Sequence, residues 1–140
     1  MEQKRRYRTL EMLLRIVTAV ILLQTLYFKF SGHPDAIHIF TSIGMEPWGR
    51  YGIGVIELIA GIMFFLPNLW RFAAFITVGL MLGAISFHLF TPLGIVVAYG
   101  GHSDGGQLFA MAVVTLIFSS ILMYRANLPE LYRSLVSKKG

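Results

Sequence analysis

Four long apolar segments separated by short polar links constrain this chain more than any other feature of its sequence. They cover about residues 10–30, 51–66, 72–90 and 108–124. A bilayer core is about 30 Å thick and a helix rises about 1.5 Å per residue, so each segment approaches the length of one crossing. We therefore predict an all-α integral membrane four-helix bundle that forms a single domain over residues 1–140.

The composition favours a membrane environment over water. Hydrophobic residues make up 56% of the chain and charged residues 14%, whereas soluble domains carry about a quarter of charged residues. So few polar side chains cannot cover a water-soluble globule. The net charge of +5 arises from bases at segment ends, without the stacking aromatics of nucleic-acid binders. We expect the lipid bilayer to be a partner and nucleic acid not to be one.

The distribution of Lys and Arg predicts the orientation. Four bases precede the first segment, one lies between the second and third, and four follow the last: Lys4, Arg5, Arg6, Arg8, Arg71, Arg125, Arg133, Lys138 and Lys139. The other side carries only Lys29 and Arg50. Because cytoplasmic flanks are enriched in bases, we predict cytoplasmic termini and two outer loops, 31–50 and 91–107. Within the first loop, the spacing of Ile37, Phe40 and Ile43 favours a short interfacial helix over residues 35–43.

Polar side chains form a stripe along the first segment. Glu11, Arg15, Thr18, Thr25 and Lys29 lie within about 80° of arc on a helix. Lipid offers these groups no hydrogen-bond partner, so we expect the stripe to face protein. Within the stripe, Glu11 and Arg15 are spaced to form a structural polar pair.

Small residues predict where the helices approach one another. Gly54 and Gly61 share a face of the second segment with Glu57, and Ala112, Thr115 and Ser119 share a face of the fourth. The third contains the pair Gly79 and Gly83, a spacing that allows close helix contact. We expect all three faces to be packing seams inside one bundle.

Glu57 is the most informative single residue, because a carboxyl inside a membrane segment is costly unless it is paired or protonated. One interpretation is a structural partner that joins the first two helices, with Lys29 as the cation. The other is a carboxyl with a raised pKa that handles protons or binds a ligand. Both stay open at the level of sequence.

A set of polar residues near the outer side could line one pocket. By depth alone, the ligand-binding candidates are Lys29, Glu57, His88, His102 and Asp104. His88 points about 140° away from the Gly83 face, so headgroup contact is its alternative. His33 and His38 are poorly spaced for a shared metal, and we predict no metal site. We find no catalytic constellation, and the absence of cysteine excludes thiol redox chemistry in this chain.

Four motifs in order resemble the DoxX family of small bacterial membrane proteins: Leu22–Phe30, Gly44–Arg50, Gly54–Gly61 and Gly83–Leu89. The resemblance extends from about Arg15 to Arg125 and implies a four-helix bundle in the bacterial cytoplasmic membrane. The family is named for a subunit associated with quinone-linked sulfur oxidation, and related members are linked to redox partners or act as accessory proteins. No pair of haem ligands is evident in facing helices here.

Three functions compete at this stage. The first is a non-catalytic accessory or scaffold subunit of a membrane complex with a redox partner, which would not be an enzyme on its own. The second is binding of a quinone or another lipophilic ligand at an outward-facing pocket around Glu57. The third and weakest is transport of a small solute or proton, which would need a homo-oligomer because four helices enclose little space.

Overall fold

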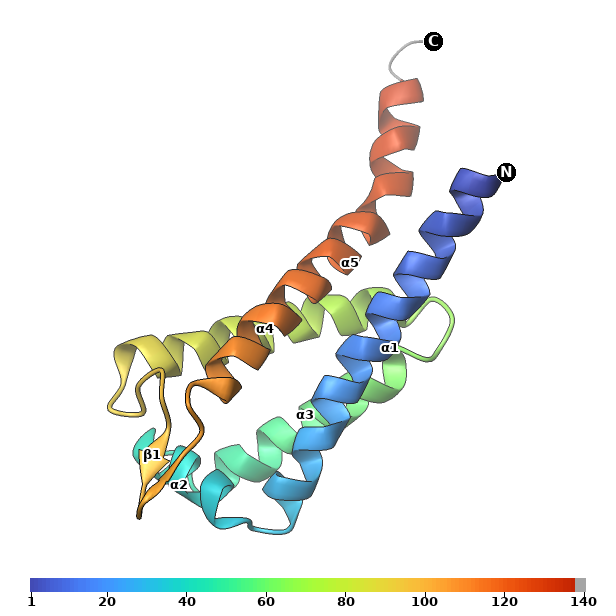
Figure 1. Ribbon diagram of the computed structural model, residues 1–140. Coiled ribbons are helices and arrows are strands. Elements are labelled where there is room, and N and C mark those ends of the chain that lie inside the picture. Colours follow the sequence, from blue (N-terminus) through green and yellow to red (C-terminus); the bar gives the residue numbers. More distant parts are fainter. Residues whose placement is uncertain (138–140) are drawn as a thin grey trace.

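The computed structural model describes residues 1–137, with side chains described for residues 1–127. Lys138 and Lys139, used above in the charge count, lie outside the described residues, as does the side chain of Arg133. The elements in chain order are α1 (Glu2–Phe30), α2 (Pro34–Ser42), α3 (Trp48–Met63), α4 (Trp70–Phe90), β1 (Ala98–Tyr99), β2 (His102–Ser103) and α5 (Gln107–Ser137) (Figure 1).

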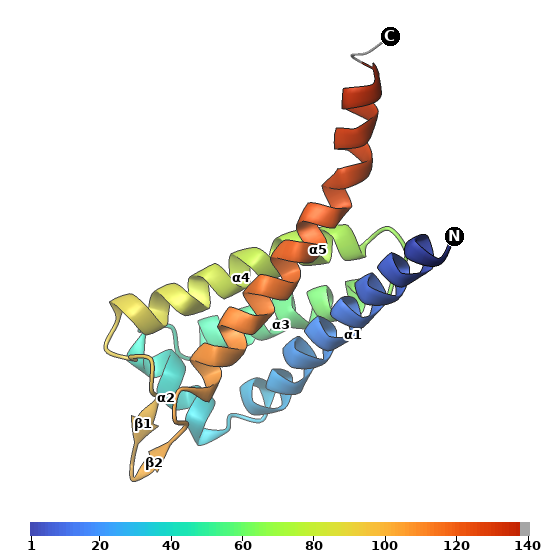
Figure 2. The same cartoon turned by 45° about the horizontal axis from the view of Figure 1, so that its top comes forward.

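The helices α1, α3, α4 and α5 form a bundle in which each packs on two others. The closest pairs are α1 with α3 and α4 with α5, and further contacts join α3 to α4 and α1 to α5. The short α2 and the β1–β2 hairpin lie at the end opposite the N-terminus and the end of α5 (Figures 1 and 2). The predicted all-α membrane bundle is thus confirmed. Which compartment each end faces stays a prediction.

Three of the helices are long and apolar enough to cross a membrane, namely α1, α4 and the Gln107–Asn127 part of α5. The fourth bundle helix, α3, has 16 residues and is therefore only about 24 Å long. It ends at Met63, before the expected residue 66, and the chain then turns through Pro67 and Asn68, whose φ is 68°. The protein is a multi-pass membrane protein in which α3 is the shortest member of the bundle.

Both outer helices extend past the apolar segments that predicted them. The helix α1 begins at Glu2 and α5 continues to Ser137. Lys, Arg and Glu have high helix propensity, so a helix can continue past the apolar segment into a polar environment. Arg125 Nη2 donates a hydrogen bond to the Tyr7 carbonyl at 2.8 Å, which joins these two extensions. Apolarity therefore located the membrane segments, but not the ends of the helices.

The two links predicted as outer loops contain regular structure. The short helix expected over residues 35–43 is present as α2, whose first turn is capped by His33 Nδ1 accepting from the Asp35 N–H. The second link forms an antiparallel hairpin that turns at Gly100 and Gly101, both with positive φ. Glycine permits that backbone conformation without a Cβ clash.

The small-residue faces of α3 and α5 lie inside the bundle as predicted. A Cβ added at Gly61 would be 2.6 Å from Leu23 Cδ2, and one at Gly54 would be 3.1 Å from Phe30 Cζ. On α5, Ala112, Thr115 and Ser119 are buried. These glycines let α1 approach α3 closely.

The prediction for the glycine pair of α4 was wrong. A Cβ at Gly79 or Gly83 would have no atom within 4 Å, so neither glycine lies at a contact within this chain. The buried line of α4 runs through Ala73, Thr77 and Met81 instead. At about 100° per residue, Gly79 and Gly83 lie about 200° and 240° from Thr77, on the outer side of the bundle.

Candidate functional site

The centre of the candidate site is an ion pair between α1 and α3. Lys29 in the last turn of α1 lies with its Nζ 2.8 Å from Glu57 Oε2, and the two side chains are 13% and 7% exposed. The Thr25 hydroxyl, one turn earlier on α1, donates to the same oxygen at 3.0 Å. The two helices run in opposite directions, so the end of α1 meets the middle of α3. Two of the five predicted ligand-binding residues are thus brought together.

Among the described residues, only one of the two carboxylate oxygens of Glu57 has a donor. The hydrogen bond and the ion pair found among the described residues both end on Oε2. Oε1 accepts no hydrogen bond from a described residue, and it is not among the fully occluded polar atoms that lack a partner. The geometry therefore matches the structural interpretation of Glu57 and leaves one acceptor for a further group.

A second cation, Arg50, caps the C-terminal end of α1 beside this pair. It is 4% exposed, and its Nε and Nη2 donate to the Glu46 carboxylate at 2.7 to 3.0 Å. Its Nη1 donates to the Lys29 carbonyl, and its guanidinium lies 4.4 Å from the centre of the Tyr51 ring. Arg50 therefore satisfies a carbonyl at the last turn of α1, where no helical donor remains.

Arg50 and Glu46 were not among the site residues predicted from the sequence. A usable signal was present, because the two residues are four apart and oppositely charged. The bond from Arg50 to the Lys29 carbonyl had no such signal, since every residue offers a carbonyl.

Arg15 also donates to a helix-terminal carbonyl, at the C-terminal end of α3. Its Nε and Nη2 donate to the Phe64 carbonyl at 2.8 and 2.6 Å, and its guanidinium lies 5.4 Å from the centre of the Trp70 ring. The expected pairing with Glu11 is present only at 4.0 Å. The main partner of Arg15 is thus a helix-terminal carbonyl rather than the neighbouring carboxylate.

His88 and Asp104 belong to the α4–α5 end of the site region. The His88 ring is buried, with Nδ1 2.6 Å from the Gly94 carbonyl and the ring edge against Phe109. No hydrogen bond or ion pair among the described residues joins His88 to Lys29 or Glu57. The residue is used to hold the link after α4 against α5.

Asp104 caps the start of α5. Its Oδ1 accepts from the N–H groups of Val97 and Gly106, and its Oδ2 accepts from that of Leu108, at 2.8 to 3.1 Å. Burial by itself raises the pKa of Asp104, but these three hydrogen bonds and the nearby His88 lower it, and the net pKa lies below the ordinary value. The side chain of His102, by contrast, is exposed on the hairpin.

A separate polar cluster ties the hairpin to α2. The Tyr99 hydroxyl donates to Asp35 Oδ1, which together with burial and the carboxylate charge raises the pKa of Tyr99. The His38 ring stacks on Tyr99 with 4.2 Å between ring centres. Among the described residues, no group of three or more His, Asp or Glu side chains is arranged to hold a metal ion.

Comparisons with known proteins agree with this architecture. A family model described as DoxX matches residues 10–92. A curated relative from Bacillus subtilis (strain 168), named "Putative oxidoreductase CatD", is 34% identical over 74 residues, which cover 53% of this chain and 55% of the relative. The chain thus matches about half the length of that relative. No solved structure matches this chain.

Proposed function

This chain belongs to the DoxX family of membrane proteins, and from that premise we propose that it is a non-catalytic accessory subunit of a membrane complex. The observation that carries the proposal is the pairing of Lys29 with Glu57 at 2.8 Å, with both side chains largely buried. A buried carboxylate that is compensated by its own protein supports a structural role for the α1–α3 centre. Such a subunit would position a partner rather than transform a substrate.

A redox-linked complex is part of this proposal. The relative from Bacillus subtilis carries the name of an oxidoreductase. The DoxX family model matches residues 10–92, a range that includes Lys29 and Glu57. This chain has no cysteine, so thiol chemistry would have to reside in another subunit. We therefore assign the electron-transfer centre to the partner and the membrane anchoring to this chain.

The outward face of α4 is the contact that we propose for the partner. Gly79 and Gly83 are four residues apart and open, with no atom within 4 Å of an added Cβ. Small residues at this spacing let a second transmembrane helix approach the backbone. A helix of the redox partner would fill this face, and a second copy of this chain is the alternative occupant.

The test compares the double variant Gly79→Leu/Gly83→Leu with Gly52→Leu. All three glycines are open, so none of these changes should unfold the chain. Cross-linking in the native membrane, followed by extraction in mild detergent and mass measurement, should show a complex that only the double variant loses. A wild-type chain that is monomeric before and after extraction would overturn the accessory role, and a cross-linked dimer would identify a second copy.

A second candidate, binding of a quinone or similar lipophilic ligand, is favoured by Glu57 Oε1. This oxygen accepts no hydrogen bond from a described residue and lies on the carboxylate that Lys29 holds in place. A hydroxyl or amide donor of a ligand could bind there while the helices enclose its tail. Titration with a short-tailed hydroquinone should then show binding that Glu57→Ala abolishes, because alanine has no side-chain acceptor. Equal binding by Glu57→Ala with unchanged helicity would remove this candidate and leave the accessory role untouched.

A further inference from the structure

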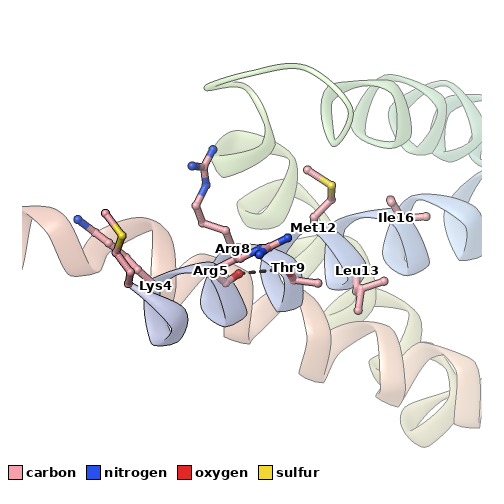
Figure 3. A pocket seen from close by; sticks show the side chains of 8 residues that line it. Lys4, Arg5, Arg8, Thr9, Met12, Leu13 and Ile16 are labelled. Carbon is pink, nitrogen blue, oxygen red and sulfur yellow. Dashed lines mark hydrogen bonds between the residues drawn. The ribbon is translucent and has the colours of Figure 1, made fainter.

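The first turns of α1 carry a hollow that none of the polar contacts above uses. It has a volume of about 480 Å³ and follows one face of the helix (Figure 3). Its lining residues are Met1, Lys4, Arg5, Arg8, Thr9, Met12, Leu13 and Ile16. Lys4, Arg5 and Arg8 lie toward the start of the helix, and Met12, Leu13 and Ile16 lie further along it (Figure 3). The hollow is therefore divided along its length into a positively charged part and an apolar part.

The charge in this hollow is not compensated by its own lining. Three of the eight lining residues are cations and none is acidic. Among the described residues, the side chains of Lys4, Arg5 and Arg8 form no ion pair, whereas Lys29, Arg15 and Arg50 all have protein partners. A neighbouring hollow of about 390 Å³ includes Glu2 beside Arg5 and Arg6, and is thus less suited to an anion.

We propose that the larger hollow binds one anionic phospholipid. The phosphate of this lipid would lie among Lys4, Arg5 and Arg8, and one of its acyl chains would lie along Met12, Leu13 and Ile16. From Arg5 to Ile16 the helix rises about 16 Å, close to half of the 30 Å or so that a bilayer core measures. The cations thus reach the headgroup layer of a leaflet while the apolar end reaches its hydrocarbon.

The apolar half of the hollow decides between possible anions. A nucleic acid or an acidic peptide would satisfy the cations but has no acyl chain to cover Met12, Leu13 and Ile16. A zwitterionic lipid would fill the apolar half but brings no net charge to the three cations. An anionic phospholipid satisfies both halves at once. This inference does not rest on the proposed accessory role, since it concerns the other end of the bundle.

The test uses the full chain in mild detergent, with phosphatidylglycerol or phosphatidylcholine added and the bound lipid counted by native mass spectrometry. The matched variants are Arg8→Gln and Arg6→Gln, which remove equal charge from exposed positions two residues apart, although only Arg8 lines the larger hollow. Arg8→Gln should weaken phosphatidylglycerol binding about fivefold, the effect of one cation near a lipid surface. Arg6→Gln should weaken it less than about twofold.

Two further arms separate this site from a diffuse or phosphate-only attraction. Ile16→Ser should reduce binding of long-chain phosphatidylglycerol but leave the dihexanoyl form unchanged, because only the long chain reaches Ile16. Inorganic phosphate at the same concentration should not displace the lipid. Equal losses in Arg6→Gln and Arg8→Gln, no preference over phosphatidylcholine, or displacement by inorganic phosphate would each overturn the proposal.

Discussion

The two closest helix pairs of this bundle are held together by different chemistry. Between α1 and α3, charged groups cross from one helix to the other: Lys29 to Glu57, Arg50 to the end of α1, and Arg15 to the end of α3. Between α4 and α5, the buried hydroxyls bond within their own helices. Thr77 donates to the Ala73 carbonyl, and Ser119 donates to that of Thr115.

This difference indicates which contacts specify the fold and which only permit it. An arginine that caps the end of a neighbouring helix fixes the position of one helix along the other, because a shift by one turn would break the bond. A hydroxyl that bonds to its own helix is satisfied in any position and lets the neighbour approach. The α1–α3 pair therefore defines the register of the bundle, and the α4–α5 pair contributes close packing.

Breaking the Lys29–Glu57 pair should have the largest effect on stability. Glu57→Leu leaves the buried ammonium of Lys29 without its partner and should cost about 3–5 kcal/mol. The double variant Lys29→Met/Glu57→Leu should recover most of this loss, because no unpaired charge remains. Thr115→Val, the control between α4 and α5, should cost about 1 kcal/mol or less. Unfolding titrations with denaturant in mixed micelles measure all three, and equal losses for the single and double variants would contradict this account.

Removing the cap at the end of α3 should have the next largest effect. Arg15→Leu deletes two hydrogen bonds to the Phe64 carbonyl, and bonds to a charged donor contribute about 1.5–3 kcal/mol. We expect the unfolding free energy to fall by about 2 kcal/mol and amide exchange to rise at the end of α3. Glu11→Gln is the control, since its oxygen is 4.0 Å from Arg15, and it should change stability little. A larger effect of Glu11→Gln would show that the carboxylate is the main partner.

Adding one methyl group should change the free energy of unfolding in opposite directions at two glycines. Gly61→Ala places a Cβ 2.6 Å from Leu23 Cδ2 and should destabilise the α1–α3 pair by about 1–3 kcal/mol through overpacking. Gly79→Ala meets open space and should stabilise α4 by up to about 1 kcal/mol, because alanine favours helix. The same micelle titration compares them. Destabilisation of the isolated chain by Gly79→Ala would mean that α4 is rotated from its position here.

Acid should weaken the start of α5, with the smallest effect of the four. The pKa of Asp104 is depressed in the folded chain, so its contribution is complete above the ordinary value of 3.8. It is lost as the pH falls through 3.8 toward the lower folded value. Asp104→Asn should lose this contribution at neutral pH and should therefore flatten the acid dependence, measured as amide exchange at Leu108. An unchanged acid profile would exclude Asp104 as its source.

The candidate site was only partly predictable from sequence. The pairing of Lys29 with Glu57 was one of two interpretations, because opposite charges in adjacent membrane segments have few other partners. Their association with His88, His102 and Asp104 in one pocket was inferred from depth alone. The structure instead places His88 on a loop carbonyl and Asp104 on backbone N–H groups. Contacts with backbone groups cannot be predicted from residue types, since every residue has a backbone carbonyl.

The sequence by itself determined that this chain enters a membrane and that its charged stripe on α1 faces protein. Both follow from transfer free energies that add residue by residue, so they do not depend on which helices pack against one another. Only the tertiary structure decided the rotation of α4, which turned Gly79 and Gly83 outward, and the two arginine caps between α1 and α3. A helix that is apolar on all sides carries no periodic signal for its buried face, so packing against its neighbours sets that rotation.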